Sequence, residues 1–159
     1  MEPTIRRAIE ADSEQLALLS LVAWDEAYRD ILDPDALRRR HDEPSAVRRE
    51  RWVNRIAENE VFVALADIEI VGYARTTAPA PGESHELLGL YTRERYWRSG
   101  LGSRLLLQCL PSGAAHLWLF EGNERALRFY ERHGFSLDGR RRLDPPYGAE
   151  LHMSRGATW

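Results

Sequence analysis

The stretch YWRSGLGSRLL, residues 96–106, lies between a strand-like run at 85–92 and an apolar helical pattern. Gly100 and Gly102 let the backbone approach a ligand closely, because neither residue carries a Cβ atom. A strand, a glycine loop and a helix start together present backbone N–H groups to an anion. The stretch therefore predicts a binding site for a phosphorylated cofactor at the start of a helix.

Two better-known phosphate loops do not fit this spacing. A P-loop requires a lysine after its second glycine, and the chain contains no lysine at all. The dinucleotide fingerprint requires a third glycine three residues after the second, where this chain has Leu105. A tight turn before a core helix stays open as the alternative interpretation of the glycine pair.

A second segment, LWLFEGNERALRFYERHGF at residues 117–135, predicts an apolar strand followed by a helix. Asn123 is typical of a helix N-cap, and Gly134 followed by the apolar Phe135 is typical of a C-cap. Taken with the glycine loop, this segment resembles the GNAT-type N-acetyltransferase family, from about residue 60 to the C-terminus. The matching residues are Gly100, Gly102, Asn123, Ala126, Tyr130, Gly134 and Phe135.

The resemblance implies an α/β (α+β) fold with a mixed, largely antiparallel sheet flanked by helices, in a single acetyltransferase-like domain at 1–159. It implies acetyl-CoA as the co-substrate and no metal. In the family the glycine loop cradles the pyrophosphate, and the helix after Asn123 lies beside the pantetheine arm. The implied cofactor-binding residues are Leu90, Tyr91, Thr92, Arg98, Ser99, Gly100, Leu101, Gly102, Ser103, Asn123 and Tyr130.

One position departs from the family pattern. The family usually carries Gln or Arg three residues before the first loop glycine, and this chain carries Trp97 there. We interpret Trp97 as a packing residue and expect the adjacent Arg98 to supply the cation.

Acetyl transfer to an amine needs a neutral nucleophile and a proton for the departing thiolate. An alkylamine with a pKa near 10.4 costs roughly 4–5 kcal/mol to deprotonate at pH 7, so a base is useful. Glu86 is the candidate base, directly or through a water, and its alternative role is only to attract a cationic substrate. Tyr130 is the candidate acid, and its alternative is a core tyrosine with a satisfied hydroxyl. A backbone N–H near Leu90 is expected to meet the oxyanion.

The acceptor is expected to be a primary amine of a small molecule or peptide. The family builds its substrate pocket between the first helices and the last hairpin, which implies Trp24, Tyr28, Glu86 and Tyr147 as substrate-binding residues. A small cationic amine, a polyamine, an amino sugar and a protein N-terminus all stay open, as does a homodimer.

Composition narrows the class of protein. The 159 residues are 43% hydrophobic and 30% charged with a net charge of -3, which indicates neither disorder, a membrane span nor a nucleic-acid partner. The N-terminus lacks a signal-peptide core, so a cytoplasmic location is expected. Cys109 is the only cysteine and is interpreted as a core residue. Arg38–Arg40 and Arg48–Arg51 are predicted to form solvated helix faces, because acidic residues are interspersed.

The remaining elements alternate along the chain. Asp12 and Gln15 predict a capping box for a helix that ends near Tyr28. The other expected elements are a strand at 4–8, helices from Pro34 to about His41 and from Ser45 to about Glu58, a hairpin at 61–66 and 70–77, and two last strands around 145–148.

Two rival functions remain at this level. An acyl-CoA-binding regulatory module without turnover would keep the glycine loop but tolerate Tyr130→Phe and Glu86→Gln. An ordinary interaction domain with this fold would not bind CoA. The presence of both Glu86 and Tyr130 favours the enzyme.

Overall fold

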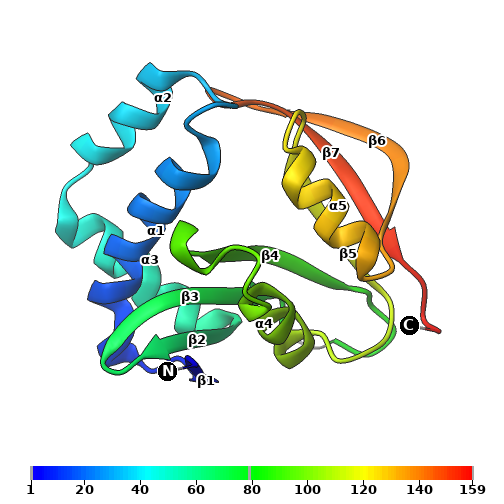
Figure 1. The fold of residues 1–159 in the computed structure, drawn as a ribbon, viewed down its shortest axis with the longest axis horizontal. Coiled ribbons are helices and arrows are strands. Elements are labelled where there is room, and N and C mark those ends of the chain that lie inside the picture. The colour runs from blue at the N-terminus through cyan, green and yellow to red at the C-terminus, as the bar shows by residue number, and fades with distance from the viewer. Residues whose placement is uncertain (1, 79, 159) are drawn as a thin grey trace.

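A mixed seven-stranded sheet organises the chain, with helices on both of its faces (Figure 1). The structure is a computed structural model and describes residues 2–78 and 80–158. In space the strands run β1-β2-β3-β4-β5-β7-β6, and every neighbouring pair is antiparallel except β4 and β5. This confirms the fold class expected from the sequence. The strands are β1 (Thr4–Arg7), β2 (Glu60–Ala66), β3 (Glu69–Thr76), β4 (His85–Thr92), β5 (Ala115–Phe120), β6 (Ser136–Asp144) and β7 (Gly148–Arg155).

The helices divide between the two faces of the sheet. On one face, α1 and α3 pack over β2 and β3 through Leu16, Trp52 and Tyr73. On the other face, α4 and α5 pack over the middle strands through Leu105, Leu117 and their neighbours. The helices are α1 (Ser13–Tyr28), α2 (Pro34–Arg39), α3 (Ser45–Glu58), α4 (Leu101–Cys109) and α5 (Glu124–Arg132). Among the described residues, no helix is both long enough and apolar enough to cross a bilayer.

The parallel strands β4 and β5 pair only at their first residues. His85, Glu86 and Leu87 lie opposite the first three residues of β5, and the pairing goes no further in the part of the chain that the structure describes. From residue 88 onward β4 keeps its partner β3 but presents an open edge toward β5. In Figure 1 the two strands diverge beneath α4 and α5. The divergence matters because an open strand edge is a row of unpaired backbone donors and acceptors.

The N-terminus of α1 differs from the expected capping box. The Asp12 side chain caps nothing in α1; it accepts the backbone N–H of Ile9 at 2.8 Å and pairs with Arg6. Gln15 instead reaches the β2–β3 turn, where it accepts the backbone N–H of Ile70 at 3.1 Å. The predicted capping box was wrong because a bidentate guanidinium competes for the same carboxylate.

We expect Arg6→Gln to destabilise the fold at neutral pH. Arg6 donates two hydrogen bonds, at 2.8 and 3.0 Å, to the buried Asp12 carboxylate, and these lower the pKa of Asp12. Because Arg6 itself is half exposed, the loss should be about 1–2 kcal/mol of unfolding free energy. A carboxyl group whose pKa is lowered by folding stabilises the folded state at pH values above its unfolded pKa, and this stabilisation is lost as the pH falls through the folded pKa. The difference in stability between Arg6→Gln and wild type should therefore shrink below about pH 4.

Urea unfolding at pH 7 and pH 3 measures this difference. Arg7→Gln is the matched control, because Arg7 is an exposed neighbour whose side chain pairs with Glu60 at 3.2 Å. Equal stability of the two variants at pH 7 would show that the buried pair contributes no more than the exposed one.

Candidate active site

The glycine loop turns the chain into α4 through an unusual backbone. Gly100 is the N-cap residue of α4 and has φ +89°, a conformation that other residues adopt only with strain. Arg98, two residues earlier, has φ +63° and an exposed side chain. A Cβ atom on Gly102 would lie 3.4 Å from the ring of Phe129 in α5. Gly100 is therefore required by the turn, whereas a Cβ atom at Gly102 would come only into ordinary van der Waals contact with Phe129.

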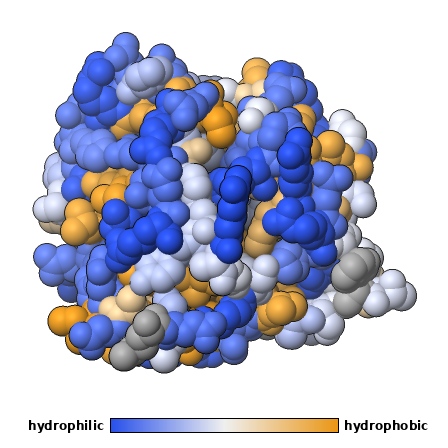
Figure 2. All heavy atoms as spheres, in the orientation of Figure 1, coloured by the Kyte–Doolittle hydropathy of each residue, from blue (hydrophilic) through white to orange (hydrophobic). Residues whose placement is uncertain are grey.

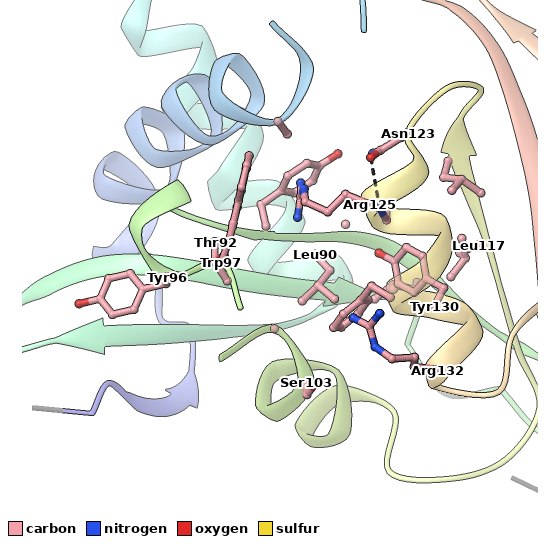
Figure 3. A pocket seen from close by; sticks show the side chains of 18 of the residues that line it. Leu90, Thr92, Tyr96, Trp97, Ser103, Leu117, Asn123, Arg125, Tyr130 and Arg132 are labelled. Carbon is pink, nitrogen blue, oxygen red and sulfur yellow. Dashed lines mark hydrogen bonds between the residues drawn. The ribbon is translucent and has the colours of Figure 1, made fainter. Parts of the chain in front are cut away.

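A cavity of about 340 Å³ lies where β4 and β5 diverge, bounded by α4 and α5 (Figure 3). In Figure 2 hydrophilic side chains border a hollow between the N-terminal helices and α5. Many of the residues expected to bind cofactor or substrate line this cavity. They are Tyr28, Leu90, Tyr91, Thr92, Arg98, Gly100, Gly102, Ser103, Asn123 and Tyr130.

Helix α5 carries the polar groups of one wall. The Asn123 side chain accepts the backbone N–H of Ala126 at 3.2 Å, the capping bond expected from the sequence. This bond fixes the first turn, and Tyr130 follows two turns later with its hydroxyl directed into the cavity (Figure 3). Burial raises the pKa of Tyr130 well above its ordinary value, because the phenolate would lose its hydration. The phenol is therefore protonated at any physiological pH.

Trp97 and Arg125 form a contact that the sequence did not indicate. The Arg125 guanidinium lies 3.8 Å from the centre of the Trp97 ring, and both residues line the cavity. The expectation that Trp97 only packs was incomplete, since its ring holds a cation in the cavity wall. Arg125, Phe129 and Arg132 recur at spacings of four and three residues. That spacing could have placed them on the cavity-facing side of α5.

The α1 side of the cavity is aromatic. The Tyr28 hydroxyl lies 2.7 Å from that of Tyr91, and burial raises the pKa of both groups. Trp24 and Tyr147, also expected to bind substrate, do not line this cavity. Trp24 packs edge-on against Tyr28 with ring centres 4.9 Å apart, so it supports the cavity-lining Tyr28 without lining the cavity itself. Tyr147 lines a second cavity on the other side of Trp24.

Glu86 lies outside the cavity, at the closed end of the β4–β5 pair. Its backbone N–H donates to the Thr77 hydroxyl at 3.1 Å, and its partner on β5 is His116. Burial lowers the pKa of His116, while the charge of Glu86 acts in the opposite direction. The next residues, Leu87 and Leu88, do line the cavity. The structure therefore brings Glu86 close to the site without giving it direct access.

Two residues of the loop also fall outside the cavity lining. The Leu101 side chain is 2% exposed and packs in the core, so only its backbone faces the loop. The Ser99 hydroxyl donates to the carbonyl of Tyr96 and accepts the N–H of Leu101 at 3.3 Å. Both residues shape the turn, because their polar groups are engaged within it.

The cavity suits an extended ligand that ends in phosphates. The open edge of β4 offers unpaired backbone groups to an amide-containing chain, as an added strand would. At one end of this edge lie the N-terminus of α4 and the exposed Arg98, which favour negative charge. At the other end the Tyr130 hydroxyl faces the space. The residues present thus fit the cofactor expected from the sequence.

Comparisons with known proteins agree with this geometry. The acetyltransferase (GNAT) family matches residues 24–135 of the chain. A protein of Mycobacterium tuberculosis named "Probable N-acetyltransferase" is 30% identical over 151 residues, which cover 86% of this chain and 81% of that protein.

Solved structures show the same fold. The PaiA N-acetyltransferase of Thermoplasma acidophilum, in complex with coenzyme A, superimposes with a TM-score of 0.80 at 21% identity, over 98% of this chain and 99% of that one. A GCN5-related N-acetyltransferase from Rhodopseudomonas palustris gives 0.76 at 15% identity, over 98% and 96%. Acetyl-CoA is the acetyl donor of this class of enzymes, as the sequence predicted. The family matches more than half of the chain, and the Mycobacterium tuberculosis protein is 30% identical to it. The chain is therefore a member of the acetyltransferase (GNAT) family.

Proposed function

We propose that this protein transfers an acetyl group from acetyl-CoA to the primary amine of a small molecule or peptide, by direct attack of the amine. The observation that carries this proposal is that the open edge of β4, the glycine loop and the Tyr130 hydroxyl all border one cavity. A binding module needs the first two features. Only an enzyme needs a protonated phenol at the far end of that cavity.

The chain's own residues would hold the cofactor in three places. Backbone N–H groups at Gly102 and Ser103, with the Arg98 side chain, would bind the pyrophosphate. The backbone of residues 90–92 would pair with the amides of the pantetheine arm. Asn123 borders the same cavity but uses its side-chain oxygen to cap α5, so its role is to position that helix.

Acetyl-CoA supplies a thioester carbonyl carbon and a thiolate leaving group when bound. The backbone N–H near Leu90 would stabilise the negative charge that develops on the carbonyl oxygen. Tyr130 would hold the proton that the departing sulfur takes up. Its raised pKa keeps this oxygen protonated at neutral pH, so the proton is present when the sulfur departs.

We assign removal of the amine proton to Glu86 acting through water. Glu86 does not line the cavity although the next residues, Leu87 and Leu88, do, so a bridging water fits better than direct contact. The acceptor would enter beside Tyr28, on the α1 side of the gap between the strands.

Acetyl-CoA titration by calorimetry, followed by thiol release over a panel of amines, tests this function. Mass spectrometry of the product should show one added acetyl group. Binding of acetyl-CoA with no turnover on any amine would instead favour the regulatory acyl-CoA-binding module.

Glu86→Gln is expected to lower kcat/KM by about 10²-fold at pH 7, since general-base catalysis contributes about 10²–10⁴-fold. The loss should diminish as the pH approaches the acceptor's own pKa, because the amine then deprotonates without help. A pH–rate profile of both enzymes measures this. Glu83→Gln, an exposed carboxylate in the preceding loop, is the matched control. Identical profiles for Glu86→Gln and wild type would remove Glu86 from the mechanism.

A further inference from the structure

A second cavity, of about 220 Å³, lies between α1, α3 and the turn that joins α2 to α3. It is separate from the cofactor cavity and shares none of its lining residues. Its walls are unusually basic. The lining consists of Ala17, Ser20, Leu21, Arg40, Glu43, Arg48, Arg51, Trp52, Arg55 and Tyr147.

The charges in this cavity do not balance. Four arginines face a single carboxylate, Glu43, in a chain whose net charge is -3. That carboxylate is already engaged by Arg51, and the Glu43 carbonyl by Arg48. Buried or half-buried charges are normally paired, so an excess of positive charge in a concave site calls for an anion.

Two arginines that line the cavity each carry a guanidinium nitrogen with no hydrogen-bond partner among the described residues. They are Nη1 of Arg40 and Nε of Arg48, and both are buried. Arg40 lies over the Trp24 ring at 4.2 Å, and its Nη2 donates to the Ser20 carbonyl at 3.4 Å. An unpaired buried donor costs free energy, which a ligand oxygen would recover.

Burial lowers the pKa of two of the arginines that line this cavity. These are Arg40 and Arg55, and the pKa of Arg55 falls to about 10. Both groups stay charged at pH 7.

The expectation that Arg38–Arg40 and Arg48–Arg51 form solvated faces was wrong for Arg40 and Arg48. Arg40 is half-buried against α1 and Arg48 is half-buried beside the Glu43 carbonyl, whereas Arg38, Arg39 and Arg49 remain exposed.

We propose that this second cavity binds an oxyanion, the carboxylate or phosphate group of a small molecule. Planar guanidinium groups match the paired oxygens of both anions. The site also lies close to the acceptor side of the protein. Trp24 contacts Arg40 on one side and Tyr28, which lines the cofactor cavity, on the other. The anion is therefore either part of the acceptor or a separate ligand, and only the first choice rests on the proposed function.

Calorimetric titration of inorganic phosphate into the protein tests the site. Saturation with CoA keeps phosphate away from the glycine loop, and chloride at equal ionic strength serves as the salt control. We expect saturable binding in the wild type. Arg40→Gln and Arg48→Gln should each weaken it by about tenfold or more, because each removes a charge-assisted hydrogen bond.

Arg49→Gln is the matched control, since it makes the same charge change on the exposed face of α3. It should leave phosphate binding unchanged. No binding in the wild type, or equal weakening in all three variants, would overturn the proposal. CoA affinity, measured on the same samples, reports whether each variant is folded. The comparison of variants can also be made without CoA, so a failure of the proposed function does not obscure the result.

Turnover then distinguishes the two sources of the anion. In the first arm, matched amines with and without a carboxylate are compared, such as an amino acid and its amide. A preference for the carboxylate that Arg48→Gln abolishes, while Arg49→Gln retains it, assigns the site to the acceptor. Phosphate binding without such a preference assigns it to a separate anion.

Discussion

Tyr130→Phe is expected to lower kcat by about 10²–10⁴-fold, the usual contribution of a positioned general acid. The change removes one oxygen and leaves the ring that packs beside Phe129 and Phe135. Since the groups proposed to hold the pyrophosphate and the pantetheine amides lie elsewhere, the Kd for acetyl-CoA should stay within about twofold of wild type. A fall in kcat without a change in binding is the signature of a group that acts in the transition state.

Single-turnover thiol release and calorimetry measure the two quantities separately. Tyr96→Phe is the control, because Tyr96 lines the same cavity but its ring lies far from Tyr130 (Figure 3). The pKa of Tyr130 is raised, so the proton it donates is retained at high pH. Wild-type activity should therefore show no loss from this group up to about pH 10, the ordinary tyrosine pKa. An unchanged rate in Tyr130→Phe would exclude the phenol as the acid.

Gly100→Val is expected to raise the Kd for acetyl-CoA by about 10²-fold or more. A β-branched residue at φ +89° costs about 1–2 kcal/mol of backbone strain. The loop relieves that strain by leaving the left-handed region, which turns its N–H groups away from the phosphates. Losing two charge-assisted hydrogen bonds of about 1.5–3 kcal/mol each accounts for the effect.

Gly113→Val separates this effect from simple destabilisation. Gly113 has φ +94°, and a Cβ atom there would meet nothing within 4 Å, as at Gly100, but it lies in the loop between α4 and β5. Both variants should lose similar stability in thermal unfolding. Only Gly100→Val should lose acetyl-CoA affinity in calorimetry. Equal binding by the two variants would show that the loop at Gly100 does not hold the cofactor.

Much of the site was predictable because it is local in sequence. The bounds of β4 follow from its apolar run, and the turn at Gly100 follows from a glycine that precedes a helix. The Asn123 cap and the positive φ of Gly134 depend on bonds within four residues. Such short-range features need no knowledge of the rest of the chain.

Other features could not be predicted, because they depend on partners outside the local segment. Asp12 carries a capping signal, but a guanidinium six residues away on another element takes its carboxylate. The last hairpin places Tyr147, a predicted substrate-binding residue, in the arginine-lined cavity and not in the cofactor cavity, which local sequence could not indicate. Glu86 was expected in the pocket, but pairing with β5 holds it at the closed end.

By itself, the sequence determined the glycine loop, the capped helix after Asn123 and the order of strands and helices, since these rest on backbone conformation and nearest-neighbour hydrogen bonds. Only the tertiary structure decided which side chains share a cavity. Arg125 of α5 contacts Trp97 of the loop, and Arg40 and Arg48 line one cavity beside α1. The reason is physical: side chains from elements far apart in the sequence pack against one another, and the early end of the β4–β5 pairing leaves the space that forms the cofactor cavity.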